Sequence, residues 1–317
     1  MKILANDGIP QSGIGALETA GFEVITTKVA QIQLENYINK HQIDTLIVRN
    51  TTQVRQELMD NCPSLKLIDV ASVDTDNIDV EYAIDQGLHL VSTPIAISNA
   101  VAELVFAHLF GMVRFLHQSN REMPLEGDLR FNELKRAFSA GTELRGKTLG
   151  IIGFDPIGQA AANLAIGLGM KVLVYNFNVE TISITLEFFD GQKVHFHLQP
   201  SEFEKVLKQS DFISVHGTLQ DSYLLVEKEI NKMKKSIEIV NTANGKVLDE
   251  VALINAIETE KVMYAGLDVY ENEPQPEIQL LMNPELSLTP HIGSATVEAQ
   301  TKIGIELANQ IIQLLHV

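Results

Sequence analysis

The chain has 317 residues, 45% of them hydrophobic and 21% charged, which is enough for two globular domains with apolar cores. Its 24 lysines and arginines stand against 41 aspartates and glutamates, so the formal net charge is −17. That charge repels nucleic-acid phosphates and anionic lipid surfaces, so we expect neither nucleic acid nor a membrane as a partner. An anionic ligand therefore needs a local site that works against the global field.

The single cysteine, Cys62, excludes an intramolecular disulfide and fits a reducing compartment. The first residues indicate a strand followed by a turn, not a signal peptide. No uninterrupted apolar stretch reaches the ~20 residues that a membrane span needs. We therefore expect a cytoplasmic protein.

In the first hundred residues, short branched apolar runs alternate with segments of helical spacing, which is typical of a parallel sheet covered by helices on both faces. The expected strands are 2–5, 23–26, 45–48, 67–70 and 89–91, and the expected helices are 12–20, 31–40, 54–61 and 80–86. One long apolar helix is then expected over 98–120, capped by Ser98 or Asn99. Such a helix packs between domains or across a dimer contact, and 121–141 reads as a surface excursion.

A second alternating series begins at residue 147. Its expected strands are 148–152, 172–175, 212–215, 237–241 and 264–267, with a helix over 157–168. Two runs of strict alternation around Asp190-Gly191 predict a β-hairpin insertion over about 181–199. The fold class is thus α/β, with two Rossmann-like doubly wound parallel sheets, and a closing helix over about 296–315 is expected to return to the first domain.

A strand, tight turn and helix meet at Gly153-Phe154-Asp155-Pro156-Ile157-Gly158. A dinucleotide site has glycine at the middle position, where the backbone touches the diphosphate, but this chain has Asp155. An aspartate followed by proline is a good helix start, so we interpret Asp155 as a cap that takes the place of the phosphates. Taken alone, the segment is equally compatible with an ordinary strand-to-helix turn.

The acid that holds the adenosine ribose in such domains is expected at the end of the next strand. This chain has Asn176 there, which lacks the bidentate anion. The substitution weakens the prediction of a nucleotide site from this segment alone.

Several motifs in fixed order resemble the D-isomer-specific 2-hydroxyacid dehydrogenases over nearly the whole chain. Within that family the likeness is strongest to the short form of bacterial D-3-phosphoglycerate dehydrogenases, without a C-terminal regulatory domain. The motifs are Gly141–Gly150, the glycine turn, Asn241-Thr242-Ala243-Asn244-Gly245, Gly266–Pro274 and Thr289–Thr296, together with Val48-Arg49 and Asp76–Asp79.

The resemblance implies a substrate domain built from 1–98 and 287–317, with an NAD-binding domain over 99–286 inserted between them. It also implies a homodimer formed mostly by the NAD-binding domain, and hydride transfer between NAD and a small anionic 2-hydroxy acid such as 3-phosphoglycerate, as in serine biosynthesis. No metal site is expected.

Residue by residue, His291 falls on the family's acid/base position, Glu273 on its partner and Asp268 on a position near the nicotinamide. Histidine titrates in the useful range, and a carboxylate beside it favours the imidazolium. The arginine that clamps the substrate carboxylate is replaced by Asn244, which has neither the charge nor the planar fork.

The substrate loop departs in the same sense. A glycine-rich stretch of the family is replaced by one that contains Val73 and Asp74, which adds a negative charge beside the anion site. Arg49 is retained and is a candidate for holding a substrate phosphate. We therefore expect impaired or lost activity; the alternative is a non-catalytic homodimer with the dehydrogenase fold, a pseudoenzyme or redesigned variant.

Overall fold

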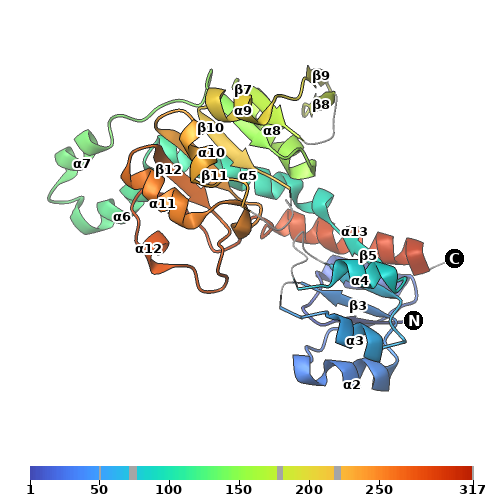
Figure 1. The fold of residues 1–317 in the computed structure, drawn as a ribbon. Coiled ribbons are helices and arrows are strands. Elements are labelled where there is room, and N and C mark those ends of the chain that lie inside the picture. Colours follow the sequence, from blue (N-terminus) through green and yellow to red (C-terminus); the bar gives the residue numbers. More distant parts are fainter. Residues whose placement is uncertain (50, 71–76, 177–180, 218–222, 316–317) are drawn as a thin grey trace. The chain divides into compact units, whose positions relative to one another are not determined.

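The computed structural model describes residues 1–49, 51–70, 77–176, 181–217 and 223–315 (Figure 1). The chain forms two compact units, one made of Met1–Ile97 with Ser294–Val317 and the other of Ser98–Gly293. The expected α/β class is confirmed, because both units are built on parallel sheets.

The first unit has a five-stranded parallel sheet in the order β2-β1-β3-β4-β5. Leu4, Leu46 and Ile68 are fully buried on it, and helix side chains such as Leu34 and Ile38 cover them. The elements agree with the expected ones to within two residues at each end: β1 (Lys2–Ala5), α1 (Gln11–Thr19), β2 (Glu23–Ile25), α2 (Gln31–His41), β3 (Thr45–Val48), α3 (Gln56–Asn61), β4 (Leu67–Val70), α4 (Val80–Asp85) and β5 (His89–Ser92).

The closing helix α13 (Val297–Leu315) belongs to this first unit, as expected, and packs on α1. Figure 1 shows it in red beside the blue elements of the unit. The crossing depends on two glycines, because a Cβ on Gly13 would lie 2.7 Å from the carbonyl oxygen of Gly304. Ser12 Oγ also donates to the carbonyl of Thr301, which fixes the two helices at this point.

The second unit has a six-stranded parallel sheet in the order β13-β12-β11-β10-β6-β7. The strand order reverses between β6 and β10, which is where ligands bind in open α/β sheets. Residues 287–293, expected with the first unit, lie in the second, because β13 pairs with β12. The strands are β6 (Thr148–Ile152), β7 (Lys171–Tyr175), β10 (Phe212–Val215), β11 (Ile237–Asn241), β12 (Val262–Leu267) and β13 (Leu286–Leu288).

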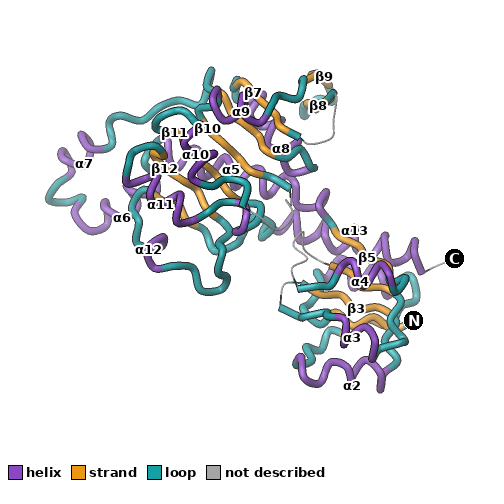
Figure 2. The backbone as a smooth tube through the Cα atoms, viewed as in Figure 1, coloured by secondary structure: helices purple, strands orange, loops and turns teal. Residues whose placement is uncertain are grey.

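The helices of this unit cover both faces of the sheet (Figure 2). The helix predicted over 157–168 is present and begins at Pro156, whereas most of the shorter helices of this unit were not predicted from the sequence. The helices that follow β6 are α8 (Pro156–Gly167), α9 (Phe203–Gln209), α10 (Glu227–Lys232), α11 (Glu250–Glu258) and α12 (Ile278–Leu281), with a 3₁₀ turn, η1, at Gly245–Val247.

The long helix differs from the expectation of 98–120. It is α5 (Pro94–Val113), and a separate helix α6 (Leu116–Glu126) follows. The helix ends because Phe115 has a left-handed backbone, with φ of 56°, and because the Thr142 amide donates to the Val113 carbonyl. Residues 95–113 are long and apolar enough to span a membrane, but most of their side chains, including Val105, are buried within the protein.

The excursion after α5 carries α6 and α7 (Phe131–Ala137), which stand away from the sheet of this unit (Figure 2). Its apolar side chains are mostly in solvent: Leu125 is 79% exposed, Leu129 86% and Phe131 56%. The arm, defined here as residues 116–140, therefore presents apolar surface that the described residues of the chain do not cover.

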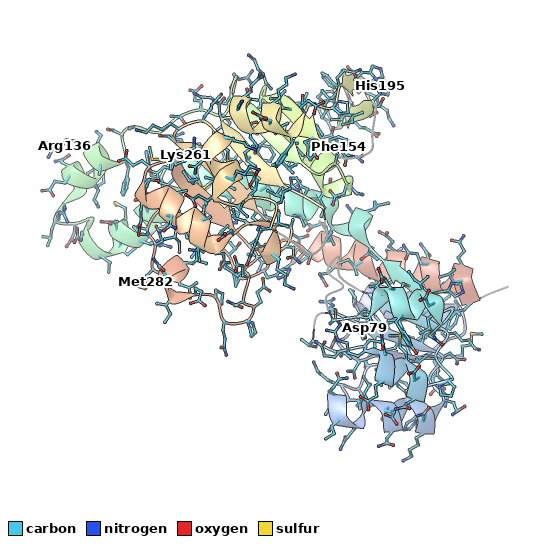
Figure 3. The ribbon with its side chains drawn as sticks, viewed as in Figure 1. Asp79, Arg136, Phe154, His195, Lys261 and Met282 are labelled. Atoms are coloured by element: carbon cyan, nitrogen blue, oxygen red, sulfur yellow. The ribbon has the colours of Figure 1, made fainter. Side chains whose placement is uncertain are left out.

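The predicted hairpin is confirmed: β8 (Ile182–Glu187) and β9 (Lys193–Leu198) pair antiparallel around a turn at Gly191, whose φ is 83°. Ile182 and Ile184 are buried in the core that also holds α8. The opposite face carries His195, which is labelled in Figure 3. Its Nδ1 lies 2.9 Å from Thr185 Oγ1.

Candidate active site

The predicted site residues of the second unit follow different strands of one parallel sheet. Asp155 follows β6, Asn176 follows β7, Asn244 follows β11, Asp268 follows β12 and His291 follows β13. The carboxyl ends of parallel strands share one edge of the sheet, so these residues gather along that edge. Because they come from separate strands, their grouping depends on the fold, not on their spacing in the sequence.

The two residues predicted to form an acid/base pair are in contact. His291 Nδ1 lies 2.7 Å from Glu273 Oε2, and each side chain is a little over one-third exposed. Burial alone raises the pKa of Glu273, but the bond from His291 and the Tyr270 amide outweigh it and hold the pKa below its usual value. The glutamate is therefore a carboxylate, and Nδ1 is the nitrogen that faces it.

The loop that carries His291 has an unusual backbone. The φ of His291 is 54°, in the left-handed region that side chains other than glycine seldom adopt. Asp268 holds this loop, since its carboxylate accepts from the amides of Ile292 and Gly293, both at 2.8 Å. Asp268 thus acts on the backbone beside the histidine, which is a finding the sequence did not predict.

The glycine turn has the close contacts of a nucleotide-binding loop. A Cβ on Gly153 would lie 1.8 Å from the His216 carbonyl oxygen, and one on Gly158 would lie 2.5 Å from the Gly153 carbonyl oxygen. Both positions therefore require glycine, with φ of 91° at Gly153. This part of the turn fits a dinucleotide.

The middle of the turn does not fit a diphosphate in the same way. Asp155 is the N-cap of α8, and its Oδ1 accepts from the Gly158 amide at 2.8 Å, as the sequence predicted. Pro156 has no amide hydrogen, and the Gln159 amide donates to the Asp155 carbonyl. A diphosphate at this helix start must therefore displace the Asp155 carboxylate and tolerate its charge.

A buried histidine that sequence reasoning missed lies beside this turn. His216 follows β10, and its Nε2 lies 2.8 Å from Ser214 Oγ. Burial lowers the pKa of His216 to about 4, against the opposing effect of the Asp155 carboxylate. The available signal was a histidine directly after a fully buried apolar strand, at the strand next to the glycine turn.

Asn244, predicted from the sequence to stand at the position of the family's arginine, has a local structural role. It caps the 3₁₀ turn η1, and its Oδ1 accepts from the Lys246 amide at 2.8 Å. Gly245 follows so closely against the Tyr270 carbonyl that a Cβ would lie 2.0 Å from its oxygen. The asparagine thus satisfies the turn that carries it.

The candidate substrate residues lie in the first unit. Arg49 follows β3, and its Nη2 donates to Gln300 Oε1 at 2.9 Å. The backbone around it is fixed, because Asp7 Oδ2 accepts from the Arg49 amide and Asn77 Nδ2 donates to its carbonyl. Val73 and Asp74 lie outside the described residues.

Comparison with known proteins decides the family. Residues 106–293 match the model of the D-isomer specific 2-hydroxyacid dehydrogenase NAD binding domain. The chain belongs to this family. The match confirms the predicted family and the predicted cofactor, NAD, because the matched domain is an NAD-binding one. It covers nearly all of the second unit.

Relatives with several names share the full-length likeness. The chain is 36% identical to the hydroxypyruvate reductase of Thermotoga maritima, over 87% of this chain and 86% of that protein, and 34% identical to the glyoxylate reductase of Thermococcus litoralis, over 98% and 92%. It is 32% identical to the D-3-phosphoglycerate dehydrogenase of Bacillus subtilis, over 98% of this chain and 56% of that longer protein.

Solved structures agree with the fold. The chain superposes on a glyoxylate reductase from Paecilomyes thermophila with a TM-score of 0.81 and 31% identity, covering 98% of this chain and 94% of that one. A D-lactate dehydrogenase from Aquifex aeolicus, complexed with NAD and lactic acid, matches with a TM-score of 0.77 and 26% identity, covering 100% and 96%. The Rossmann-like architecture of both units is thereby confirmed.

Proposed function

We propose that this protein transfers hydride between NAD and a D-2-hydroxy acid, with weakened binding of the cofactor and of the substrate carboxylate. The observation that carries the proposal is the contact of 2.7 Å between His291 Nδ1 and Glu273 Oε2. The weakening rests on Asp155 and Asn244, whose polar side chains serve the protein's own helix starts.

The proton chemistry follows from the donor inventory of the pair. A carboxylate accepts hydrogen bonds only, so the neutral His291 carries its proton on Nδ1 and presents the Nε2 lone pair. In the oxidising direction Nε2 takes the substrate hydroxyl proton, and Glu273 stabilises the imidazolium that results. In the reducing direction Nε2–H returns that proton to the carbonyl oxygen. NAD, when bound, supplies the hydride acceptor or donor at the carbon.

For the substrate we propose a small anionic 2-hydroxy acid, with 3-phosphoglycerate as the first candidate. Arg49 supports a phosphate-bearing substrate, because it offers a permanent cation on a rigid strand end. The relatives named for glyoxylate and hydroxypyruvate support a smaller one. Reduction of phosphohydroxypyruvate, hydroxypyruvate and glyoxylate in parallel distinguishes these substrates.

A second candidate is a non-catalytic family member. It is favoured by Asp155, whose carboxylate accepts the hydrogen bond from the Gly158 amide that a phosphate would otherwise accept. Such a cap stabilises the helix start in a protein that binds no cofactor. Titration of NADH by fluorescence, followed by the three reductions, separates the two candidates. Absent binding and absent turnover support the second, while tight binding with brisk turnover contradicts the proposed weakening of the sites.

We also propose that the protein acts as a homodimer through the second unit. The arm supports this, because Leu125, Leu129 and Phe131 present an apolar surface that isolated monomers seldom leave in water.

A further inference from the structure

A row of polar side chains crosses the core of the second unit and links α5 to the loop of His291. His108, on α5, is only 3% exposed. Its Nδ1 lies 2.9 Å from Ser287 Oγ, and its Nε2 lies 3.1 Å from Thr289 Oγ1. Ser287 lies in β13 and Thr289 follows it, so one imidazole bridges two residues of the segment that leads to the histidine.

The hydroxyl of Thr289 sets the direction of these bonds. Thr289 Oγ1 donates its proton to Asp268 Oδ1 at 2.6 Å, so it can only accept from His108. Nε2 of His108 therefore carries the hydrogen, and Nδ1 accepts from Ser287. Burial lowers the pKa of His108 to about 4, against the opposing effect of Asp268, so the ring is neutral near pH 7 and holds one proton.

The row ends on the backbone that shapes the active site. Asp268 is 1% exposed and accepts from three donors: Thr289, the Ile292 amide and the Gly293 amide. The two amides directly follow His291, whose left-handed backbone needs such external support. A shift of the Asp268 carboxylate would therefore move the loop on which the imidazole of His291 depends.

Two glycines provide the room for this arrangement. A Cβ on Gly266, in β12, would lie 2.7 Å from the Cβ of His108, so no larger residue allows α5 to approach the strand with a histidine there. A Cβ on Gly293 would lie 3.1 Å from Asp268 Oδ2. The close approach at both ends indicates that the row is built into the packing of the unit.

We propose that His108 is a positioning residue for His291, acting through Thr289 and Asp268 on the backbone of residues 291–293. The role in catalysis rests on the proposed function, since it needs His291 to transfer a proton. A purely structural role would require only a side chain of similar volume on α5. The hydrogen bond from Nε2 to Thr289 is what distinguishes the two.

Three variants test this distinction. His108→Leu keeps the volume and removes both bonds, His108→Gln retains a donor near the place of Nε2, and His108→Asn is too short to reach Thr289. We expect a loss in kcat of about 10- to 100-fold for Leu and Asn, because small misplacements of reacting groups are costly. Gln should restore the rate to within about threefold of the wild type, with NADH affinity changed less than about threefold in all variants. Equal rates for Leu and Gln overturn the proposal.

Nitrogen NMR of the histidine rings gives a readout that needs no turnover. We expect His108 to be the neutral Nε2–H tautomer, and the ring signals of His291 to change in the Leu variant but not in the Gln variant. An Nδ1–H tautomer, or an unchanged His291 in all variants, overturns the inference. If the wild type reduces no 2-oxo acid, the proposed function fails, and the signals of His291 still decide whether His108 positions it.

Discussion

His291 and Glu273 meet through a single ring nitrogen: Oε2 of the glutamate lies 2.7 Å from Nδ1 of the histidine. Because the pKa of Glu273 is held low, this carboxylate stays ionised down to acidic pH, and its support of the pair is lost only as pH falls through that lowered value. The pair is therefore intact throughout the range in which a histidine titrates.

Removing the charge of Glu273 should slow the reaction more than it weakens ligand binding. For Glu273→Gln we expect kcat to fall about 10- to 100-fold, and for His291→Ala about 10²- to 10⁴-fold. Reduction of a 2-oxo acid needs the protonated His291, so its rate falls as pH rises. In Glu273→Gln this fall should begin at a lower pH, because the imidazolium has lost the neighbouring anion that stabilises it. Steady-state pH profiles check this. The exposed Glu277→Gln is the control, and an unchanged profile in Glu273→Gln refutes the assigned role.

Asp155 should weaken cofactor binding and stabilise α8 at the same time. We expect Asp155→Gly and Asp155→Asn each to tighten NADH binding by about tenfold, since both remove a carboxylate from the helix start. Asp155→Ala should lower the unfolding free energy by about 1 kcal/mol, whereas Asn still caps and should cost less.

A matched control exists at Asp249, the N-cap of α11, whose Oδ1 accepts from the Ala252 amide at 2.9 Å. Asp249→Ala should cost similar stability and leave NADH affinity unchanged. The measurements are NADH fluorescence titration and thermal unfolding. Unchanged NADH affinity in Asp155→Gly would falsify the interpretation of this residue.

If the sites are weakened as proposed, Asn244→Arg should raise the activity. A charge-assisted bidentate pair with a carboxylate is worth roughly 3–5 kcal/mol, or about 10²–10⁴ in rate when fully formed, and we expect a partial gain in kcat/KM. Loss of the bond from the Lys246 amide should cost at most about 1 kcal/mol of stability. Asn244→Lys is the control for charge without the planar fork.

The arginine should help more when the cofactor binds. We therefore expect the combined change Asp74→Gly, Asp155→Gly and Asn244→Arg to exceed the single Asn244→Arg in kcat/KM for the same 2-oxo acid. Parallel kinetic measurements on the two variants check this order. A single variant as active as the triple one would show that the acids do not limit turnover.

Glu238 should make the protein less stable as pH rises. Its Oε2 is buried without a partner among the described residues, and burial raises its pKa from 4.5 to about 8. Below pH 4.5 the Glu238 carboxyl is protonated in both the folded and the unfolded state. Between 4.5 and about 8 only the unfolded state ionises, so the unfolding free energy falls with pH, by roughly 3–5 kcal/mol in all.

Glu238→Gln should remove this dependence. We expect the variant and the wild type to have similar melting temperatures near pH 4.5, and the variant to be the more stable by about pH 8. Thermal unfolding over this range gives the comparison. Glu258→Gln, at an exposed position, should follow the wild type. A parallel decline in Glu238→Gln means that another group is responsible.

The arm should hold two copies together. Sedimentation of the wild type should give about twice the chain mass of 35.1 kDa, and Phe131→Asp should shift the protein toward the monomer. Ile32→Asp is the control, because Ile32 is an apolar side chain that is 89% exposed in the first unit. A monomeric wild type rejects the proposed dimer, and dissociation by both variants rejects the arm as its cause.

The sequence predicted the regular parts of this fold well because their signals are local. The hairpin was visible from alternation around Asp190-Gly191, and the cap at Asp155 from the Asp-Pro pair. The end of α5 could not be predicted from the sequence, because it depends on a contact between residues distant in the chain, the Thr142 amide and the Val113 carbonyl.

The site divides in the same way. Motif order located His291 and Glu273, and their contact confirms that the fold brings them together. The row from His108 to Asp268 was not predictable, because His108 lies 179 and 181 residues from its two hydroxyl partners and reads in the sequence as one polar interruption of an apolar helix.

The contact between Gly153 and the carbonyl of His216 bears on how such chains change over time. A side chain at 153 would overlap that oxygen, so the glycine is demanded by the joining of two strands whatever the protein binds. Selection for foldability alone would preserve this glycine even in a chain that binds no coenzyme. Gly153 is therefore required by the packing of the fold and is a poor indicator of nucleotide binding. Position 155, which is free of this constraint, is more informative about whether a chain of this fold binds the coenzyme.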